Sequence, residues 1–279
     1  MRLQLFSDLH LERYPDFQPQ IGVDVDVVVL AGDIGSYQNG SRLADADFGL
    51  ARFSPLQPGA VCSIVLFVPG NHEFDALDFD ATYARLRATC ARLGIGWLDR
   101  EVLHIGGVRF IGTTLWSDFE SLALREADAA RRAKALDKAF RAANYYLSKN
   151  TTLKGGVAVL AEELRAMSLD CQAWLRQALA QPFDGATVVV THFAPSLQSA
   201  DPRYGLSAGS AGFCNALDDL FPLVDVWMHG HLHCMNDYLV SGEQDGRAWQ
   251  CRVVANPLGY LSKGEQDSFR ANLVIAVGS

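Results

Sequence analysis

Val61-Cys-Ser-Ile-Val-Leu-Phe-Val68 is an apolar run, and it leads directly into the polar cluster Pro69-Gly-Asn-His-Glu73. A short, nearly continuous apolar run is typical of a strand that is covered on both faces, as in a sheet flanked by helices. Polar clusters directly after such strands lie where open α/β sheets place their functional sites. This segment therefore predicts an α/β fold and one part of a functional site.

The same unit of apolar run and polar cluster recurs four times. The runs are residues 3–6, 23–30, 187–190 and 224–228, and they precede Ser7-Asp-Leu-His10, Ala31-Gly-Asp33, Thr191-His192 and His229-Gly-His-Leu-His233. Helical spacing of apolar residues predicts helices at 81–93, 120–147 and 157–179. A hairpin is expected at 102–111, with further strands at 238–240, 252–255 and 272–277. The prediction is a mixed α/β fold with more strands than one simple parallel sheet needs.

Composition describes a chain that can bury a large core. The 279 residues are 49% hydrophobic and 20% charged, which is compatible with one large α/β domain or two smaller ones. Because no linker interrupts the motifs, we expect a single domain, residues 1–279. The long stretch at about 114–170 is the candidate for a helical insert or lid.

Charge and cysteine usage narrow the class of protein. The net charge of −8 argues against a nucleic acid partner, whose backbone needs a basic surface. No signal peptide precedes the first predicted strand, and no apolar run approaches the ~18 residues that span a bilayer. The six cysteines show no close-pair motif, so we expect them to be reduced in a cytoplasmic protein.

Side chains of metal-ligand type follow the predicted strands. They are Asp8, His10, Asp33, Asn71, His192, His231 and His233. Singly, an Asp or His after a strand is an ordinary turn or cap residue. Together they include four of the seven histidines in the chain, and His72 lies beside them. A pair of divalent metals needs a bridging carboxylate with imidazole, carboxylate or amide oxygen around it, so the set predicts a two-metal site.

The spacing of the ligand types has a structural interpretation. Alternation in Asp8-x-His10 lets two side chains of one extended loop point into the same site. His231-x-His233 repeats this spacing, and Gly230 is expected to allow a tight turn there. Mixed His and Asp ligands suit manganese, iron or zinc better than magnesium or calcium.

In this order, the motifs resemble those of the calcineurin-like metallophosphoesterase superfamily. The resemblance extends from residue 7 to residue 233 with every motif position filled, and residues 256–260 are similar to a short motif of bacterial members without an assigned substrate. It implies a four-layer α/β/β/α sandwich of two mixed β-sheets flanked by helices. It also implies a metal-dependent phosphoric ester hydrolase.

The resemblance further implies a role for each motif residue. One metal would be held by Asp8, His10, Asp33 and His233, and the other by Asp33, Asn71, His192 and His231. Asp33 would be the bridge, and a water or hydroxide between the metals would be the nucleophile. His72 would act as general acid, or as an electrostatic clamp on the transition state. The two ions would be manganese or iron, with zinc or nickel as alternatives.

Other residues receive less specific predictions. Glu73 is expected to cap the following helix, and His104 to be structural. A supporting role is considered for His229, and Asn256 is interpreted as orienting a ligand histidine. The ligand set is complete without Cys234. The candidate substrate-contacting loop residues are Trp116, Asp118, Arg203 and Tyr204.

Several functions are compatible with this site. The substrate is expected to be a small phosphorylated molecule, a phosphomonoester or a phosphodiester, with a preference for the diester. A nuclease would use the same metals, and a non-catalytic scaffold would keep the fold alone. A serine hydrolase elbow at Ser210 would need a preceding strand, which the sequence there does not predict. The oligomeric state cannot be inferred from the sequence.

Overall fold

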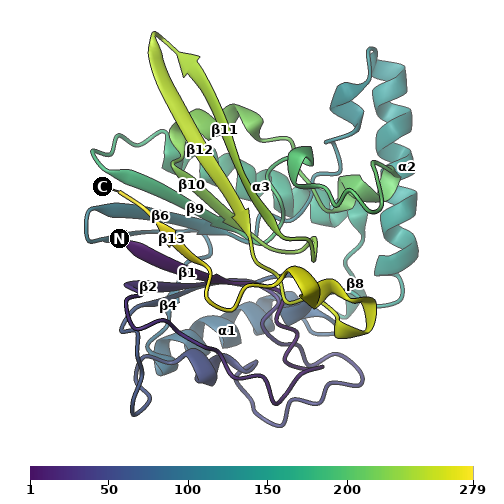
Figure 1. Ribbon diagram of the computed structural model, residues 1–279. Coiled ribbons are helices and arrows are strands. Elements are labelled where there is room, and N and C mark those ends of the chain that lie inside the picture. Colours follow the sequence, from purple (N-terminus) through teal and green to yellow (C-terminus); the bar gives the residue numbers. More distant parts are fainter. Residues whose placement is uncertain (279) are drawn as a thin grey trace.

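The computed structural model describes residues 1–278 and has four layers. Helix α1 (Phe79–Leu93) lies against one β-sheet, a second sheet packs on the first, and helix α3 (Ala161–Leu179) lies against the second sheet (Figure 1). Both sheets are mixed. The α/β/β/α sandwich expected from the sequence is therefore confirmed.

The first sheet has five strands in the order β13-β1-β2-β3-β4. Their bounds are Val274–Ala276, Arg2–Phe6, Val27–Ala31, Val65–Val68 and Gly96–Trp97. Strands β1 to β4 are parallel, and β13 is antiparallel to β1. Three strands that precede predicted ligands are therefore neighbours with the same direction.

The second sheet has six strands in the order β11-β12-β10-β9-β6-β5. Their bounds are Asn236–Gln244, Arg247–Ala255, Val226–His229, Ala186–Thr191, Val108–Thr113 and Glu101–Ile105. The four central strands are parallel, and the edge strands β11 and β5 are antiparallel to their neighbours. The β11–β12 ribbon extends beyond the body of the sheet (Figure 1).

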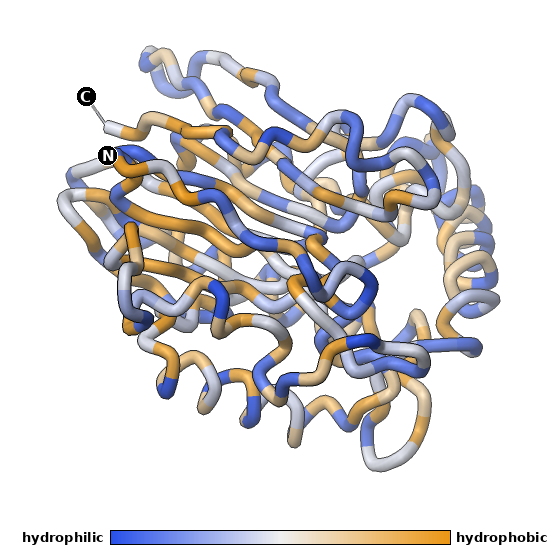
Figure 2. Tube along the Cα trace, turned by 60° about the horizontal axis from the view of Figure 1, so that its bottom comes forward, coloured by the Kyte–Doolittle hydropathy of each residue, from blue (hydrophilic) through white to orange (hydrophobic). Residues whose placement is uncertain are grey.

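Alternating strand residues build a core between the sheets and a second layer beneath the helices. Leu5 and Val29 of the first sheet meet Val190 and Met228 of the second. Their neighbours along the strands, such as Val28, face the helices instead. Figure 2 shows the resulting apolar strands in the interior. Each fully buried aliphatic side chain contributes about 1.5–3 kcal/mol, so both faces of each sheet stabilise the sandwich.

The helices begin where capping residues place them. Asp78 caps α1 by accepting a hydrogen bond from the Ala81 amide at 3.2 Å, so the helix begins at Phe79, two residues before the expected start. Helix α2 (Ala129–Leu147) begins nine residues later than expected, because Asp128 is its N-cap. Helix α3 begins four residues later than expected, because β7 (Leu153–Lys154) pairs with β8 (Val157–Ala158).

Two predicted strands are shorter than the apolar runs that suggested them. Strand β2 begins at Val27 rather than at Val23, whose surface is 84% exposed. Strand β3 begins at Val65, since Val61 is 52% exposed. Apolar residues at these positions lie in surface turns, where hydropathy alone does not reveal the boundary.

Short 3₁₀ helices complete the structure. They are η1 (Leu50–Phe53), η2 (His72–Phe74), η3 (Ala123–Arg125), η4 (Leu197–Ser199), η5 (Ala208–Gly212), η6 (Asp218–Leu223), η7 (Leu261–Lys263) and η8 (Glu265–Ser268). Ser210 lies inside η5 and does not follow a strand, which excludes the serine hydrolase elbow. Within residues 1–278, no helix has the length and apolar character needed to cross a membrane.

The ends of the two sheets meet at one edge of the sandwich. Ser7, directly after β1, forms a β-bridge with Pro257, which follows β12 of the other sheet. The amides of Leu258 and Gly259 donate to the carbonyl oxygens of Ser7 and Asp8 at 3.1 and 2.9 Å. This edge contains the carboxyl ends of the strands that precede the predicted ligands.

Candidate metal centre

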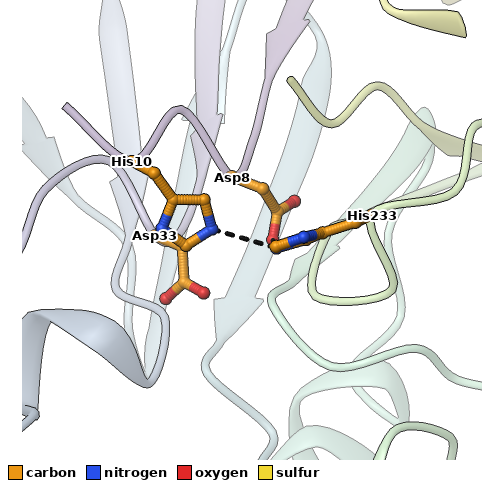
Figure 3. A group of neighbouring side chains, drawn as sticks. All are labelled: Asp8, His10, Asp33 and His233. Carbon is orange, nitrogen blue, oxygen red and sulfur yellow. Dashed lines mark hydrogen bonds and ion pairs between the residues drawn. The ribbon is translucent and has the colours of Figure 1, made fainter. Parts of the chain in front are cut away.

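The structure brings all seven predicted ligand side chains together. Two groups form, with the ligand atoms of each group within 4.8 Å of one another: Asp8, His10, Asp33 and His233, and then Asp33, His192 and His231. Asn71 is beside the second group, with its Oδ1 3.2 Å from His192 Nε2. Figure 3 shows the first group converging from separate segments of the chain. Asp33 belongs to both groups, as a bridging carboxylate would.

Left-handed backbone, rather than an extended loop, directs these side chains. Asp8 and His10 have φ of 51° and 48°, and Asp33 has φ of 54°. His231 and His233 also adopt positive φ, at 71° and 49°. The expectation of an extended Asp8-x-His10 segment is therefore wrong. Non-glycine residues in this region cost of order 1–3 kcal/mol each and cluster at functional sites, where the surrounding structure holds them.

Glycines admit close contacts between the loops. A Cβ atom at Gly230 would lie 2.6 Å from Asp8 Oδ2 and 3.0 Å from the carbonyl oxygen of Ala31. The Leu232 amide donates to the Gly230 carbonyl at 2.9 Å, so the chain makes the predicted tight turn here, and the φ of Gly230 is not positive, so the close contacts rather than a left-handed backbone require the glycine. Gly70 is similarly close to the Asp33 carboxylate. Any larger residue at either position would push apart loops that carry the candidate ligands.

Two carboxylate oxygens at the centre have no hydrogen bond. Asp8 Oδ2 and Asp33 Oδ2 are buried and accept no well-aligned hydrogen bond within residues 1–278, although His192 Nε2 lies 3.2 Å from Asp33 Oδ2. An unpaired buried carboxylate oxygen is costly unless a cation neutralises it. These atoms therefore fit a bound metal ion.

Two histidines face each other through the nitrogens that would bind metal. His10 Nε2 lies 2.9 Å from His233 Nε2. Their Nδ1 atoms contact Glu12 Oε1 at 3.1 Å and Glu265 Oε2 at 2.6 Å. Each carboxylate accepts the Nδ1 hydrogen, which leaves the lone pair of a neutral imidazole on Nε2. The raised pKa of His233 keeps a proton between the two Nε2 atoms in the metal-free centre, and a cation that displaces this proton would take both lone pairs, so the donor set fits a metal site.

Glu12 and Glu265 were not among the sequence predictions. Glu12 is two residues after His10, whereas Glu265 is far from every motif along the chain. Both are buried, with no more than 5% of their surface exposed. A carboxylate behind a ligand imidazole typically orients the ring and raises its basicity.

Glu73 holds the loops that contain Asp33 and Asn71. Its carboxylate accepts from the amides of Asp33, Ile34 and Gly70 at 3.1, 2.6 and 2.7 Å. The prediction that it caps the following helix is therefore wrong. Burial and the charge of Asp33 raise the pKa of Glu73 to about 7.

The histidines differ in their affinity for protons. Burial favours the neutral form of His192, but the charge of Asp33 raises its pKa to about 9. Burial has the same effect on His233, and hydrogen bonds with Asp8 and Glu265 raise its pKa to about 9. Burial and the charge of His192 lower the pKa of His231. Burial would raise the pKa of Asp8, but His233 lowers it to about 2.

His72 lies at the edge of the centre with 23% of its side chain exposed. Its amide donates to Asp33 Oδ1 at 2.8 Å, its Nδ1 is 2.6 Å from Asp75 Oδ2, and its Nε2 is 3.9 Å from Asp33 Oδ2. Burial would lower the pKa of His72, but the charges of Asp33 and Asp75 raise it to about 10. Asp75, a partner that the sequence did not suggest, therefore favours a proton on this ring.

His229 and Asn256 were predicted to support the ligand residues, and the structure shows such a role for His229 only. His229 Nε2 contacts Ser199 Oγ at 3.0 Å, and Nδ1 donates to the Gly230 carbonyl at 3.0 Å, so it supports the ligand loop through its backbone. Asn256 donates to the carbonyls of Leu5 and Arg270, both at 2.9 Å. Within residues 1–278 it forms no hydrogen bond with a histidine, so its predicted role in orienting one is wrong.

The other named residues lie outside the two groups. Cys234 belongs to neither, and the exposed His104 ring packs against Phe183. Trp116 and Asp118 are buried, and Asp118 accepts from Gln172 at 2.7 Å, so these two support the fold.

Arg203 and Tyr204 lie on the surface beside the centre. Arg203 Nη2 donates to the carbonyl of His233 at 3.4 Å, and Tyr204 is 70% exposed. Of the loop residues suggested by the sequence, these two remain on a surface that a substrate can approach.

Comparisons with known proteins identify the family of this chain. A curated relative, the uncharacterized protein L509 of Acanthamoeba polyphaga mimivirus, is 23% identical over 286 residues and aligns with 92% of this chain and 91% of its own. The crystal structure of the phosphopantetheinyl hydrolase PptH from Mycobacterium tuberculosis matches with a TM-score of 0.61 and 21% identity, over 94% of this chain and 90% of that one. The family model of the calcineurin-like phosphoesterases matches residues 1–235. The chain therefore belongs to the calcineurin-like phosphoesterase family, whose members are metal-dependent phosphoester hydrolases.

Proposed function

We propose that this protein hydrolyses a phosphoester with two divalent metal ions at the candidate metal centre. The observation that carries the proposal is the pair of buried, unsatisfied oxygens of Asp8 and Asp33 beside the facing Nε2 atoms of His10 and His233. In the protein alone, only the protonated rings of His192 and His233 approach these carboxylates, at 3.2 and 3.4 Å, and divalent cations would replace those protons and bind the free oxygens and the ring nitrogens together.

The ligands divide between two positions. One ion would be held by Asp8, His10, Asp33 and His233, and the other by Asp33, Asn71, His192 and His231. When bound, the pair supplies Lewis acidity and lowers the pKa of water enough to give a nucleophile at neutral pH. The mixture of nitrogen and oxygen donors favours manganese or iron, with zinc or nickel as alternatives.

The protein groups supply positioning and a proton. The left-handed residues and Glu73 hold the ligand loops in place, which limits reorganisation during the reaction. His72 offers the proton on Nε2 to the leaving oxygen, while Asp75 holds Nδ1. This assignment explains why His72 is near Asp33 without joining either ligand group.

The substrate class is a small phosphorylated molecule, and we favour a phosphodiester over a monoester. The name of PptH denotes hydrolysis of a phosphopantetheinyl group, and a likeness of 21% identity supports using such an ester only as one test substrate. The acidic net charge still argues against a nuclease. A scaffold without catalysis is disfavoured because the ligand set is complete.

Reloading experiments test the function directly. Metal-stripped protein is reloaded singly with manganese, iron, zinc or nickel, and para-nitrophenyl mono- and diesters are offered as substrates. We expect turnover of the diester that follows metal content and disappears with a chelator. No turnover of either ester with any of the four metals would overturn the proposal.

Metal binding is expected to release protons at neutral pH. Without metal, His192 and His233 have pKa values of about 9, above the usual 6.5, so both rings are protonated near neutrality. Nε2 must lose its proton to bind metal, so manganese affinity should rise with pH toward about 9. In the metal-free protein, the stabilisation from these two charged rings is complete below about pH 6.5 and is lost as pH rises through 9.

Calorimetry measures this release. Manganese titrations near pH 7, in buffers of different ionisation enthalpy, should show release of one to two protons per chain, since two ligand rings start protonated. A binding enthalpy that does not depend on the buffer would contradict the prediction.

Glu265→Gln should weaken metal binding by about 10–100-fold, the usual effect of losing a carboxylate behind a ligand histidine. Glutamine can still accept the His233 Nδ1 hydrogen, but it lacks the charge that increases the basicity of the ring. Manganese affinity is measured by titration calorimetry. Asp267→Asn is the matched control, because Asp267 lies on the same short helix, η8, and is exposed. Equal affinities in the two variants would show that Glu265 does not support the site.

A further inference from the structure

A cavity lies between helix α2, residues 122–126 and residues 206–208. Its volume is about 590 Å³. The lining includes the cations Arg125, Arg131, Lys134 and Lys138 and one carboxylate, Glu126. The cavity is therefore positively charged, although the protein as a whole has a net charge of −8.

The cations of this cavity are available to a ligand. Helix α2 contains five cationic side chains and one acidic side chain, and Lys134 and Lys138 share one of its faces, four residues apart. Among residues 1–278, Lys134, Lys138 and Arg125 form no ion pair. All three are exposed, and Arg131 pairs only with Asp128, at 3.3 Å. Unpaired cations around a concave surface favour an anion.

The short helix η5 connects this cavity with the metal centre. Its first residue, Ala208, lines the cavity, and η5 packs on α2. Ser117 Oγ donates to the carbonyl of Ala211 at 2.6 Å, which holds the segment in place. Phe213, directly after η5, has its ring centroid 5.0 Å from that of His231. A 3₁₀ helix rises about 2 Å per residue, so the path from Ala208 at the cavity to Phe213 is about 10 Å, and the ring of His231 is 5.0 Å from that of Phe213.

We propose that this cavity binds a phosphate group of the substrate that is remote from the ester being hydrolysed. The inference rests on the proposed function and extends it, because it makes the substrate a molecule with two phosphorylated positions about 10–15 Å apart. A terminal phosphate carries more than one negative charge near neutral pH, and lysine ammonium groups bind phosphate as point charges. Leu206 and Ala208 line the same cavity and would contact the apolar part of such a molecule.

A series of synthetic diesters tests the inference. Each has a para-nitrophenyl leaving group and an alkyl chain of four, eight or twelve carbons that ends in either a phosphate or a hydroxyl; ~1.3 Å per carbon lets the series bracket the expected distance. The readout is the ratio of kcat/KM between the phosphate-ended and hydroxyl-ended esters. We expect a ratio of roughly ten for the two longer chains, since each exposed ion pair contributes about two- to threefold. The ratio should decrease with salt.

Two double variants test whether the cations of the cavity cause the higher kcat/KM of the phosphate-ended esters. Lys134→Ala with Lys138→Ala should reduce the ratio to near one. Arg132→Ala with Arg141→Ala removes the same charge from the same helix outside the cavity lining, and should keep the wild-type ratio.

The outcomes separate this inference from the proposed function. If no diester is hydrolysed, the proposed function fails. If the hydroxyl-ended esters are hydrolysed and the ratio stays near one at every chain length, only the second phosphate site is overturned. If the ratio decreases equally in both double variants, the charge of the helix as a whole is responsible, and the second phosphate site is also overturned. If the cavity cations increase kcat/KM for oligothymidylates but for none of the phosphate-ended esters, the cations bind a nucleic acid strand, and this proposal is overturned.

Discussion

Asp33→Asn is expected to lower kcat/KM for an aryl phosphodiester by on the order of 10³-fold or more. Asp33 is the one side chain that belongs to both candidate ligand groups within residues 1–278. An amide at this position keeps the shape but loses the charge that would bind both ions. Metal analysis should accordingly find fewer than two ions per chain.

The interpretation depends on an intact fold. Asp33 Oδ1 also accepts from the His72 amide at 2.8 Å, and the amide oxygen of Asn can do the same. Thermal unfolding of the metal-free variant should therefore remain cooperative. Asp24→Asn is the control for losing one negative charge, because this exposed carboxylate precedes β2 and pairs with Arg2 at the start of β1, at the opposite ends of the strands from the ligands. Two tightly bound ions and near wild-type turnover in Asp33→Asn would contradict the bridging role.

Much of the fold and the ligand set could be predicted from sequence because the signals are local. A buried parallel strand shows itself as an apolar run, and its end as an abrupt change to polar residues. Asp8, Asp33 and His192 each follow such a change within two residues of a strand end. Since parallel strands place these ends at one edge, the clustering of their side chains follows from strand direction alone.

The supporting residues could not be predicted in this way, because they depend on contacts between distant segments. Glu265 reaches His233 from beyond the last motif, and Glu73 holds amides from another strand end. The left-handed conformation of Asp8 and His10 leaves only a weak local signal, since Asp and His adopt it more often than most non-glycine residues but still rarely. The strain is tolerated because hydrogen bonds from both sheets hold the loops.

Net charge was informative only as an average. The value of −8 led to the expectation of no basic surface, yet α2 contains five cationic side chains and one acidic side chain. A helix on the outside of the fold can differ in sign from the protein as a whole. Charge must therefore be evaluated for each surface once the fold is known.

His72→Ala is expected to separate the two roles that the resemblance implied for this residue. A general acid contributes about 10²–10⁴-fold, and most when the leaving oxygen is strongly basic. Two diesters are compared, one with a para-nitrophenolate leaving group and one with an alkoxide. If His72 protonates the leaving oxygen, the kcat of the variant should be lower by on the order of 10³-fold with the alkyl ester and by roughly tenfold with the nitrophenyl ester.

Equal losses on the two esters would instead assign His72 to charge stabilisation at the phosphoryl group, where the leaving group does not matter. Asp75→Asn is a second variant that changes the pKa of His72 without removing the ring. It keeps a hydrogen-bond partner for His72 Nδ1 but removes the charge that helps raise the pKa of the ring to about 10. A lower pKa makes the proton easier to lose, so the alkaline limb of the pH–rate profile should move to lower pH in Asp75→Asn. That shift should be absent when Asp75→Asn is combined with His72→Ala, because the titrating ring is gone. A limb that moves equally in both backgrounds would show that Asp75 acts on another group of the site.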